Sequence, residues 1–299
     1  MNDMEKDEEV NEQEVFEKTI EAGKILAQVR EETKEKVKPG VKLLEVAEFA
    51  EGRIVELGAK IAFPCNISIN SDAAHFTPKK GDSRVFEEGD VVKIDIGSHI
   101  DGYIADSATT VDLGDNDHLV KASREALNNA IKNVHAGADT ANIGAVIEET
   151  IREFGFKPVI NLTGHGLQPY LTHTKPTIYN FKTDRGVKLE EGSIIAIEPF
   201  ATDGSGKVVE RGETEIYSFV NPKKVRMKKA RELLKEIEEY KTLPFAKRWL
   251  NKPSPVILGK LVNEGILRGY PVLSEAGKGL VSQAEHTMIV EENGAKLIT

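Results

Sequence analysis

Apolar residues recur every three or four positions in several long stretches of the chain, which is the spacing of an amphipathic helix. Glycine closes these stretches in two places, at Gly58 and at Gly155, as expected after a helical C-terminus. This spacing predicts helices at about 10–36, 42–57, 118–134 and 141–154.

Shorter apolar runs between turn residues predict strands in the remainder of the chain. The region from about 158 to 220 consists of such runs and loops, whereas 221–270 changes to a helical and basic pattern. Further strands are predicted at 60–69, 90–96, 271–274, 280–291 and 296–299. The order indicates helices that cover a mostly antiparallel sheet, interrupted late by an insert, which is an α+β fold.

One turn-and-strand unit occurs twice. Residues 87–97 read EEGDVVKIDIG and residues 190–200 read EEGSIIAIEPF, at a constant offset of 103 residues. In both copies an apolar strand ends on a carboxylate, Asp95 in the first and Glu198 in the second. A chance match is the alternative, because turn–strand units are common; otherwise the two acids occupy equivalent positions in a pseudo-symmetric site.

Asp95 and Asp106 flank a predicted hairpin. The turn signal Asp101-Gly102 lies close to the midpoint between them. In such a hairpin the two acids lie opposite or diagonal on one face, with Cβ atoms roughly 5–8 Å apart. Two carboxylates that close cannot both stay ionised cheaply without a cation. The alternative is that one of them faces solvent and the pair has no role.

Composition narrows the class of protein. The formal net charge is −9, which argues against a surface that binds nucleic acid throughout. Residues 1–21 contain nine acids and two bases, and the first part, 1–12, is expected to be a frayed acidic start. Cys65 is the only cysteine, so an intramolecular disulfide is impossible. We find no membrane-spanning stretch and no secretory signal, and expect a cytoplasmic protein without a membrane partner.

Two further segments carry residues suited to metal binding. In Thr163-Gly164-His165-Gly166 the glycines allow close backbone approach around a histidine, and Gln283-Ala284-Glu285-His286 places a glutamate at the start of a strand. Four carboxylates and one imidazole suit a pair of hard or borderline divalent ions. The set is Asp95, Asp106, His165, Glu198 and Glu285.

These segments together resemble the type II methionine aminopeptidases. The match covers nearly the whole chain beyond the acidic start, and it includes Ala73-Ala74-His75-Phe76-Thr77-Pro78 and the helical insert at about 221–270. The resemblance implies the pseudo-symmetric pita-bread fold, with a catalytic domain of residues 1–220 and 271–299 and an insert of residues 221–270. It also implies removal of the N-terminal methionine from nascent polypeptides with a small second residue, by a monomeric enzyme.

The resemblance assigns a role to each residue of the site. Asp106 and Glu285 would bridge two divalent ions (Co, Mn, Fe or Zn), Asp95 would complete one ion site, and His165 and Glu198 the other. Glu198 would also act as general base on the attacking water. His173 would stabilise the oxyanion and His75 would contact the scissile amide. The methionine side chain would occupy a pocket formed by Phe63, Phe200, Tyr270 and His173.

The insert is basic: between residues 223 and 252 it has eleven basic and four acidic side chains. A solvated helical face is the simple interpretation, and contact with ribosomal RNA, without sequence-specific recognition, is the functional one. Two other functions remain open. A proline-directed aminopeptidase or prolidase of the same fold would use the same five ligands, and a non-catalytic binding relative would share the fold.

Overall fold

The computed structural model describes residues 12–299. Of the predicted frayed start at 1–12, all but Glu12 therefore lies outside the described residues. The α-helices are α1 (Glu12–Lys34), α2 (Leu43–Glu56), α3 (Asp117–Ile131), α4 (Thr140–Glu153), α5 (Lys228–Ile237) and α6 (Pro255–Asn263). Two single-turn 3-10 helices are η1 (Glu238–Tyr240) and η2 (Lys247–Trp249).

Fifteen strands are found in this part of the chain, and every strand pair between them is antiparallel. The strands are β1 (Lys60–Ile69), β2 (Asp72–Ala74), β3 (Val91–Ile100), β4 (Tyr103–Asp112), β5 (Lys157–Pro158), β6 (Thr163–Gln168), β7 (Leu171–Tyr179), β8 (Ile194–Ile197), β9 (Phe200–Thr202), β10 (Val208–Phe219), β11 (Phe245–Ala246), β12 (Leu267–Glu275), β13 (Val281–Gln283), β14 (Glu285–Glu291) and β15 (Gly294–Leu297). The helices and strands outside the predicted insert fall close to the predicted ranges.

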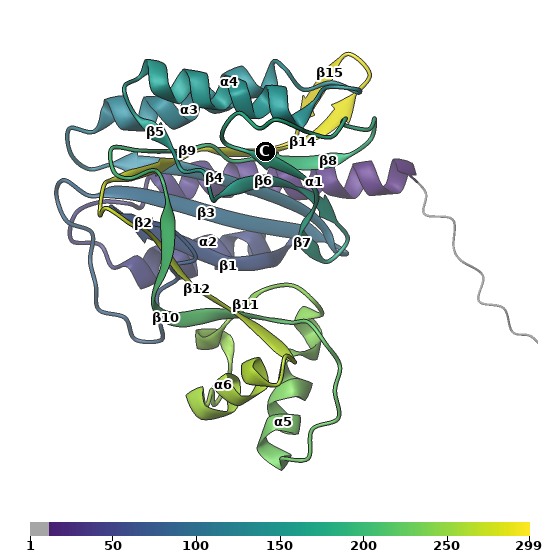
Figure 1. The fold of residues 1–299 in the computed structure, drawn as a ribbon. Coiled ribbons are helices and arrows are strands. Elements are labelled where there is room, and N and C mark those ends of the chain that lie inside the picture. The colour runs from purple at the N-terminus through teal and green to yellow at the C-terminus, as the bar shows by residue number, and fades with distance from the viewer. Residues whose placement is uncertain (1–11) are drawn as a thin grey trace, which may run out of the picture.

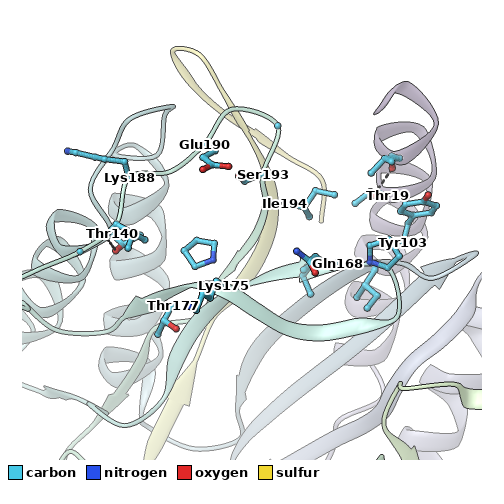
Figure 2. A pocket seen from close by; sticks show the side chains of 18 of the residues that line it. Thr19, Tyr103, Thr140, Gln168, Lys175, Thr177, Lys188, Glu190, Ser193 and Ile194 are labelled. Carbon is cyan, nitrogen blue, oxygen red and sulfur yellow. Dashed lines mark hydrogen bonds between the residues drawn. The ribbon is translucent and has the colours of Figure 1, made fainter. Parts of the chain in front are cut away.

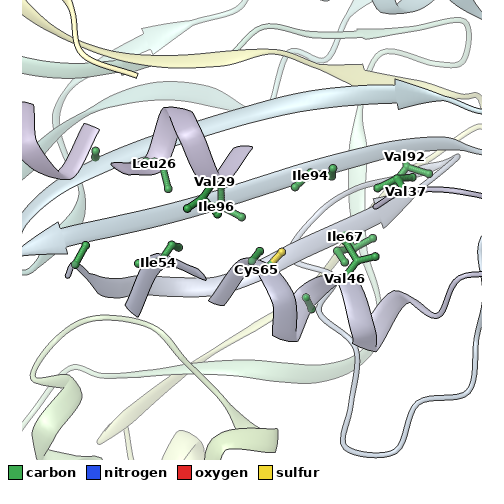
Figure 3. Packing of buried hydrophobic residues seen from close by; sticks show 14 of the residues in the cluster. Leu26, Val29, Val37, Val46, Ile54, Cys65, Ile67, Val92, Ile94 and Ile96 are labelled. Carbon is green, nitrogen blue, oxygen red and sulfur yellow. The ribbon is translucent and has the colours of Figure 1, made fainter. Parts of the chain in front are cut away.

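The main sheet has the strand order β1-β3-β4-β14-β8-β6-β7, with β15 paired to β14. Helices cover it in two pairs, α1 and α2 beside the first strands and α3 and α4 beside the later ones (Figure 1). Each pair contributes to its own apolar core, and Figure 3 shows the first, where Leu26 and Val29 of α1 pack near Ile94 and Ile96 of β3. The predicted α+β fold is confirmed.

The predicted hairpin and internal repeat have clear counterparts in the structure. Asp101 and Gly102 adopt φ values of 49° and 94°, and the two strands pair from Ile100 with Tyr103 onward. In the repeat, Gly89 and Gly192 both have positive φ, and each lies two residues before its strand, β3 or β8. Glycine adopts this backbone region without the steric penalty of a Cβ atom, so the two turns enter their strands in the same way.

The region from 221 to 266 forms a separate layer beyond β10 and β12, with α5 and α6 around their own apolar cluster (Figure 1). Strand β12 begins at Leu267 and pairs with β10, so the predicted helical insert ends in a strand that continues beyond it to Glu275. We propose residues 221–270 as the insert and the remainder as the catalytic domain.

No helix in residues 12–299 is both long enough and apolar enough to span a bilayer. Cys65 is buried and unpaired.

Candidate metal and active site

The five predicted ligands come from five neighbouring strands. Asp95 is on β3, Asp106 on β4, Glu285 at the start of β14, Glu198 directly after β8, and His165 on β6. These strands are consecutive in the main sheet, so residues up to 190 positions apart in sequence meet on one face. Asp95 pairs with Ala108, and Asp106 with Gly97, which places the two aspartates diagonally on one face of the hairpin as expected.

The side chains meet at a cavity of about 340 Å³. All ten residues that the sequence indicated for the site line it: Phe63, His75, Asp95, Asp106, His165, His173, Glu198, Phe200, Tyr270 and Glu285. The glycines beside His165 allow close packing as predicted. A Cβ at Gly164 would lie 2.5 Å from the carbonyl oxygen of Ala196, and one at Gly166 would lie 2.1 Å from that of Lys175.

Burial makes ionisation of the four carboxyl groups unfavourable. It raises the pKa of Asp95 to about 7 and the pKa values of Asp106, Glu198 and Glu285 well above their usual range. Repulsion between neighbouring carboxylates is the next cause for the last three. Four such groups at one site need cations before all of them can ionise at neutral pH.

His165 presents a free ring nitrogen to these acids. Its Nδ1 lies 3.2 Å from the carbonyl oxygen of Gly166, and because a carbonyl can only accept, Nδ1 is the donor. Nε2 then carries the lone pair, 3.8 Å from Oδ2 of Asp106 and 3.6 Å from Oε1 of Glu198. Burial lowers the pKa of His165 to about 4, so the ring is neutral, which is the form that binds metals.

The donor set fits divalent ions. Ligand atoms of Asp106, His165 and Glu285 all lie within 4.8 Å of one another. Oδ1 of Asp95, Oδ1 of Asp106 and Oε1 of Glu285 are buried and have no hydrogen-bond partner among the described residues. Buried oxygens of this kind are costly unless they are paired, and a cation would pair them.

Two more histidines and an aromatic wall face the same cavity. The His173 and His165 rings lie 4.3 Å apart between centroids, and the His75 ring meets that of Tyr270 edge to face at 5.6 Å. Burial lowers the pKa of His75 to about 4 and that of His173 well below its usual value, so both are neutral. The Phe63 ring covers Gly97, where a Cβ would lie 2.2 Å from Cε1 of the ring.

The structure adds residues that the sequence pattern did not single out. Nε2 of Gln283 lies 3.4 Å from Oδ2 of Asp95 and 3.4 Å from Oε2 of Glu198, so one amide reaches both halves of the repeat. Thr287 exchanges hydrogen bonds of 2.8 and 2.7 Å with the backbone of Asp106. Both lie within two residues of Glu285, and this closeness to a predicted ligand was the sequence signal that could have identified them. Arg268, over the Tyr270 ring at 5.1 Å, also lines the cavity.

A larger hollow of about 800 Å³ lies outside this site. Figure 2 shows it, with Lys188, Glu190 and Ser193 on one side and Thr19 and Tyr103 on the other. Its lining, all within the described part of the chain, has Glu190 as its only acid and contains no histidine. It therefore lacks the ligands for a metal, and the smaller cavity is the candidate active site.

Comparisons with known proteins agree with this geometry. The model of metallopeptidase family M24 matches residues 17–243. The chain belongs to this family. It is 67% identical over 287 residues to a methionine aminopeptidase of Archaeoglobus fulgidus, covering 96% of this chain and 99% of the relative. A methionine aminopeptidase of Pyrococcus abyssi is 52% identical over 290 residues, with 94% and 98% covered.

A solved M24-type structure has the same fold. The crystal structure of a methionine aminopeptidase from Thermotoga maritima matches with a TM-score of 0.72 at 24% identity, and the match covers 96% of each chain. The expected relationship to methionine aminopeptidases is thus confirmed, and the chain is a metallopeptidase. Divalent metal ions belong to its site.

Proposed function

We propose that the chain removes the N-terminal methionine from newly made polypeptides with a small second residue, using two divalent ions held by the five predicted ligands. The observation that carries this proposal is the convergence of all five ligands, from five consecutive strands, at one cavity with unpartnered carboxylate oxygens. Asp106 and Glu285 would be shared, with Asp95 on one side and His165 and Glu198 on the other. Cobalt, manganese, iron and zinc all suit this donor set.

Such ions, when bound, polarise a carbonyl group and lower the pKa of water. The protein then has three tasks. Glu198 accepts the proton of the attacking water at its carboxylate. His173, neutral because of its burial, donates an N–H to the oxygen that becomes negative, and His75 faces the scissile amide and assists proton transfer.

Specificity for methionine would come from the apolar side of the cavity. Phe63, Phe200 and Tyr270 supply aromatic surface there, and the His173 ring adds a fourth wall. An unbranched thioether packs well against aromatic rings. Newly made polypeptides as substrates also favour a cytoplasmic location.

The test uses protein stripped of metal and reloaded with each of the four ions. We expect cleavage of Met-Ala-Ser and little cleavage of an X-Pro peptide. Cleavage of the X-Pro peptide alone would favour a proline-directed enzyme, and no cleavage with any ion would favour a binding protein. Glu198→Gln should lower kcat by roughly 10²-fold or more. Because Glu198 is also a proposed ligand, metal content is measured in parallel, and full activity would contradict its role as base.

We also propose that the basic insert contacts ribosomal RNA. Helix α5 buries Ala230, Leu233 and Ile237 and exposes Lys228, Lys229, Arg231 and Lys235, so its exposed face is mainly basic, with Glu232 and the half-buried Glu236 as its acids. Arg248 does not belong to this surface, since its side chain is only 4% exposed. Unchanged ribosome binding at low salt after replacing the four exposed basic residues by glutamine would contradict the contact.

A further inference from the structure

The backbone at His75 is held in an unfavourable conformation. Its φ is 64°, in the left-handed region that is unfavourable for a residue with a Cβ atom. Such a conformation persists only when the surrounding structure determines it. On the N-terminal side, Ala74 of β2 pairs with Leu273 of β12. On the C-terminal side, the residues that follow His75 must also be held in place.

The residues after His75 are fixed by two hydrogen bonds with β1 and two with Arg248 of the insert. The amide of Ile67 donates to the carbonyl of Phe76 at 2.7 Å, and the hydroxyl of Thr77 donates to the carbonyl of Cys65 at 2.7 Å. Arg248, from η2, then donates from one guanidinium nitrogen to Oγ1 of Thr77 at 2.6 Å and to the carbonyl of Pro78 at 3.1 Å.

Arg248 is itself held by a buried acid. Its other terminal nitrogen donates to Glu51 of α2, and the exposed fractions of the two side chains are 4% and 8%. The Glu51 carboxylate also accepts from the amide of Cys65 at 3.0 Å and from Nε1 of Trp249 at 3.0 Å. All three partners are donors, as an acceptor-only carboxylate requires, although burial raises the pKa of Glu51; the guanidinium cannot shift without leaving the carboxylate without its counter-ion.

We propose that Arg248 and Glu51 are positioning residues for His75. The inference rests on the proposed catalytic role of His75. Through this pair the insert and α2 jointly fix Thr77 and Pro78, and thereby the direction in which the imidazole faces the cavity. The insert would thus contribute to catalysis within the molecule, independently of any contact of its basic surface.

The test is a double-mutant cycle in kinetics on Met-Ala-Ser. Asparagine tolerates the left-handed region, so His75→Asn removes the imidazole and retains the backbone. We expect Arg248→Lys to lower kcat about 10-fold with KM changed less than about 2-fold. In the His75→Asn background the same change should lower kcat less than about 2-fold, because the group it positions is absent. Metal content should be unchanged throughout.

Two further variants separate positioning from loss of fold. Thr77→Val leaves the Arg248–Glu51 pair intact and should reproduce the kcat loss, again only when His75 is present. Lys247→Gln is the matched control, because Lys247 is the neighbour of Arg248 in η2 and pairs with Glu215 at 2.8 Å rather than with Thr77. It should keep full kcat, and thermal melting verifies that every variant is folded.

Several results would overturn the inference. Equal kcat losses from Arg248→Lys in both backgrounds would show that the arginine acts independently of His75. Full activity of Arg248→Lys and Thr77→Val would also overturn the inference, and so would an equal loss of kcat in Lys247→Gln. Both results would leave the proposed function intact. Full activity of His75→Asn would instead remove the catalytic role on which both proposals depend.

Discussion

Two regions of the molecule bury carboxylates, and they offset the free-energy cost of burying a charge in different ways. Glu51 is surrounded by three donors, one of them the guanidinium of Arg248. In the active site, four acids share one cavity, and three of them have an oxygen without a hydrogen-bond partner among the described residues. In the first region the guanidinium of Arg248 balances the charge of Glu51, although Nε of Arg248 has no hydrogen-bond partner among the described residues and burial raises the pKa of Glu51. The second needs cations for all of its acids to ionise, which marks it as a binding site, whereas the first holds its neighbours in place.

The largest expected effect is loss of activity when a shared ligand is removed. Glu285→Ala should lower kcat/KM by on the order of 10³-fold or more and reduce the metal content, because the alanine has no oxygen to bind an ion. Metal analysis and peptide cleavage measure the two effects. The control is Glu190→Ala in the larger hollow, which should retain both metal and activity. Full metal content and activity in Glu285→Ala would contradict the assignment of this site.

The second prediction is an opposite effect on stability in the two regions. Glu51→Gln should lower the free energy of unfolding by about 3 kcal/mol, because it leaves a buried guanidinium without its counter-ion. Asp95→Asn should instead stabilise the metal-free protein by on the order of 1 kcal/mol at pH 8, because it removes an acid whose ionisation is opposed by burial.

Chemical denaturation of both variants after metal removal gives the two values. The metal-loaded proteins provide the control, since Asp95→Asn should no longer be more stable than the unsubstituted protein once ions are bound. A similar destabilisation by both substitutions in metal-free protein would show that the two regions do not differ as described.

How much of this could be read from the sequence depends on the range of the contacts. The Asp101-Gly102 turn determines the register between Asp95 and Asp106, and the internal repeat relates Asp95 to Glu198, so these positions follow from local pattern. The catalytic histidines and the methionine pocket were assigned by resemblance to a family.

The contacts that depend on tertiary structure could not be predicted. Arg248 appears in the sequence as one more basic residue of the insert, and only its contact with Glu51, 197 positions away, shows that it is buried. The first four residues of β12, from Leu267 to Tyr270, were placed in the insert, and the strand was predicted only from about residue 271, for a related reason. Its pairing partner is β10, and short apolar runs do not show which strand they will pair with.

The third prediction concerns pH. The folded-state pKa values of the four acids are raised, so their cost to folding is absent at low pH and grows as pH rises toward those values. The buried histidines have lowered pKa values, and their cost vanishes above pH 6.5, where unfolded histidine is neutral too. Between about pH 6.5 and 8 the acids therefore contribute more than the histidines to the pH dependence of the free energy of unfolding.

In this window Tm of the metal-free protein should fall as pH rises, and the increase in Tm caused by adding metal should widen. Differential scanning calorimetry with and without chelator measures both. The variant Glu285→Gln should show a smaller dependence, because it has one acid fewer. A metal-dependent increase in Tm that is constant across the window would contradict the competition between protons and ions.

The smallest effect is expected at a carboxylate that neither burial nor metal controls. Glu32 on α1 accepts from Nε of Arg53 at 2.7 Å, and Arg53 lies on the same helix as Glu51, two residues away. Water competes for this pair and screens it, so Arg53→Gln should change Tm much less than Glu51→Gln does. Both substitutions change a residue of α2 that takes part in an ion pair, and the two pairs differ in burial; Arg53→Gln also removes the contact with Glu56. An equal fall in Tm would mean that α2 itself, rather than the desolvated carboxylate of Glu51, accounts for the sensitivity of that region to substitution. The contrast with the metal site would then rest on the four acids of the candidate active site alone.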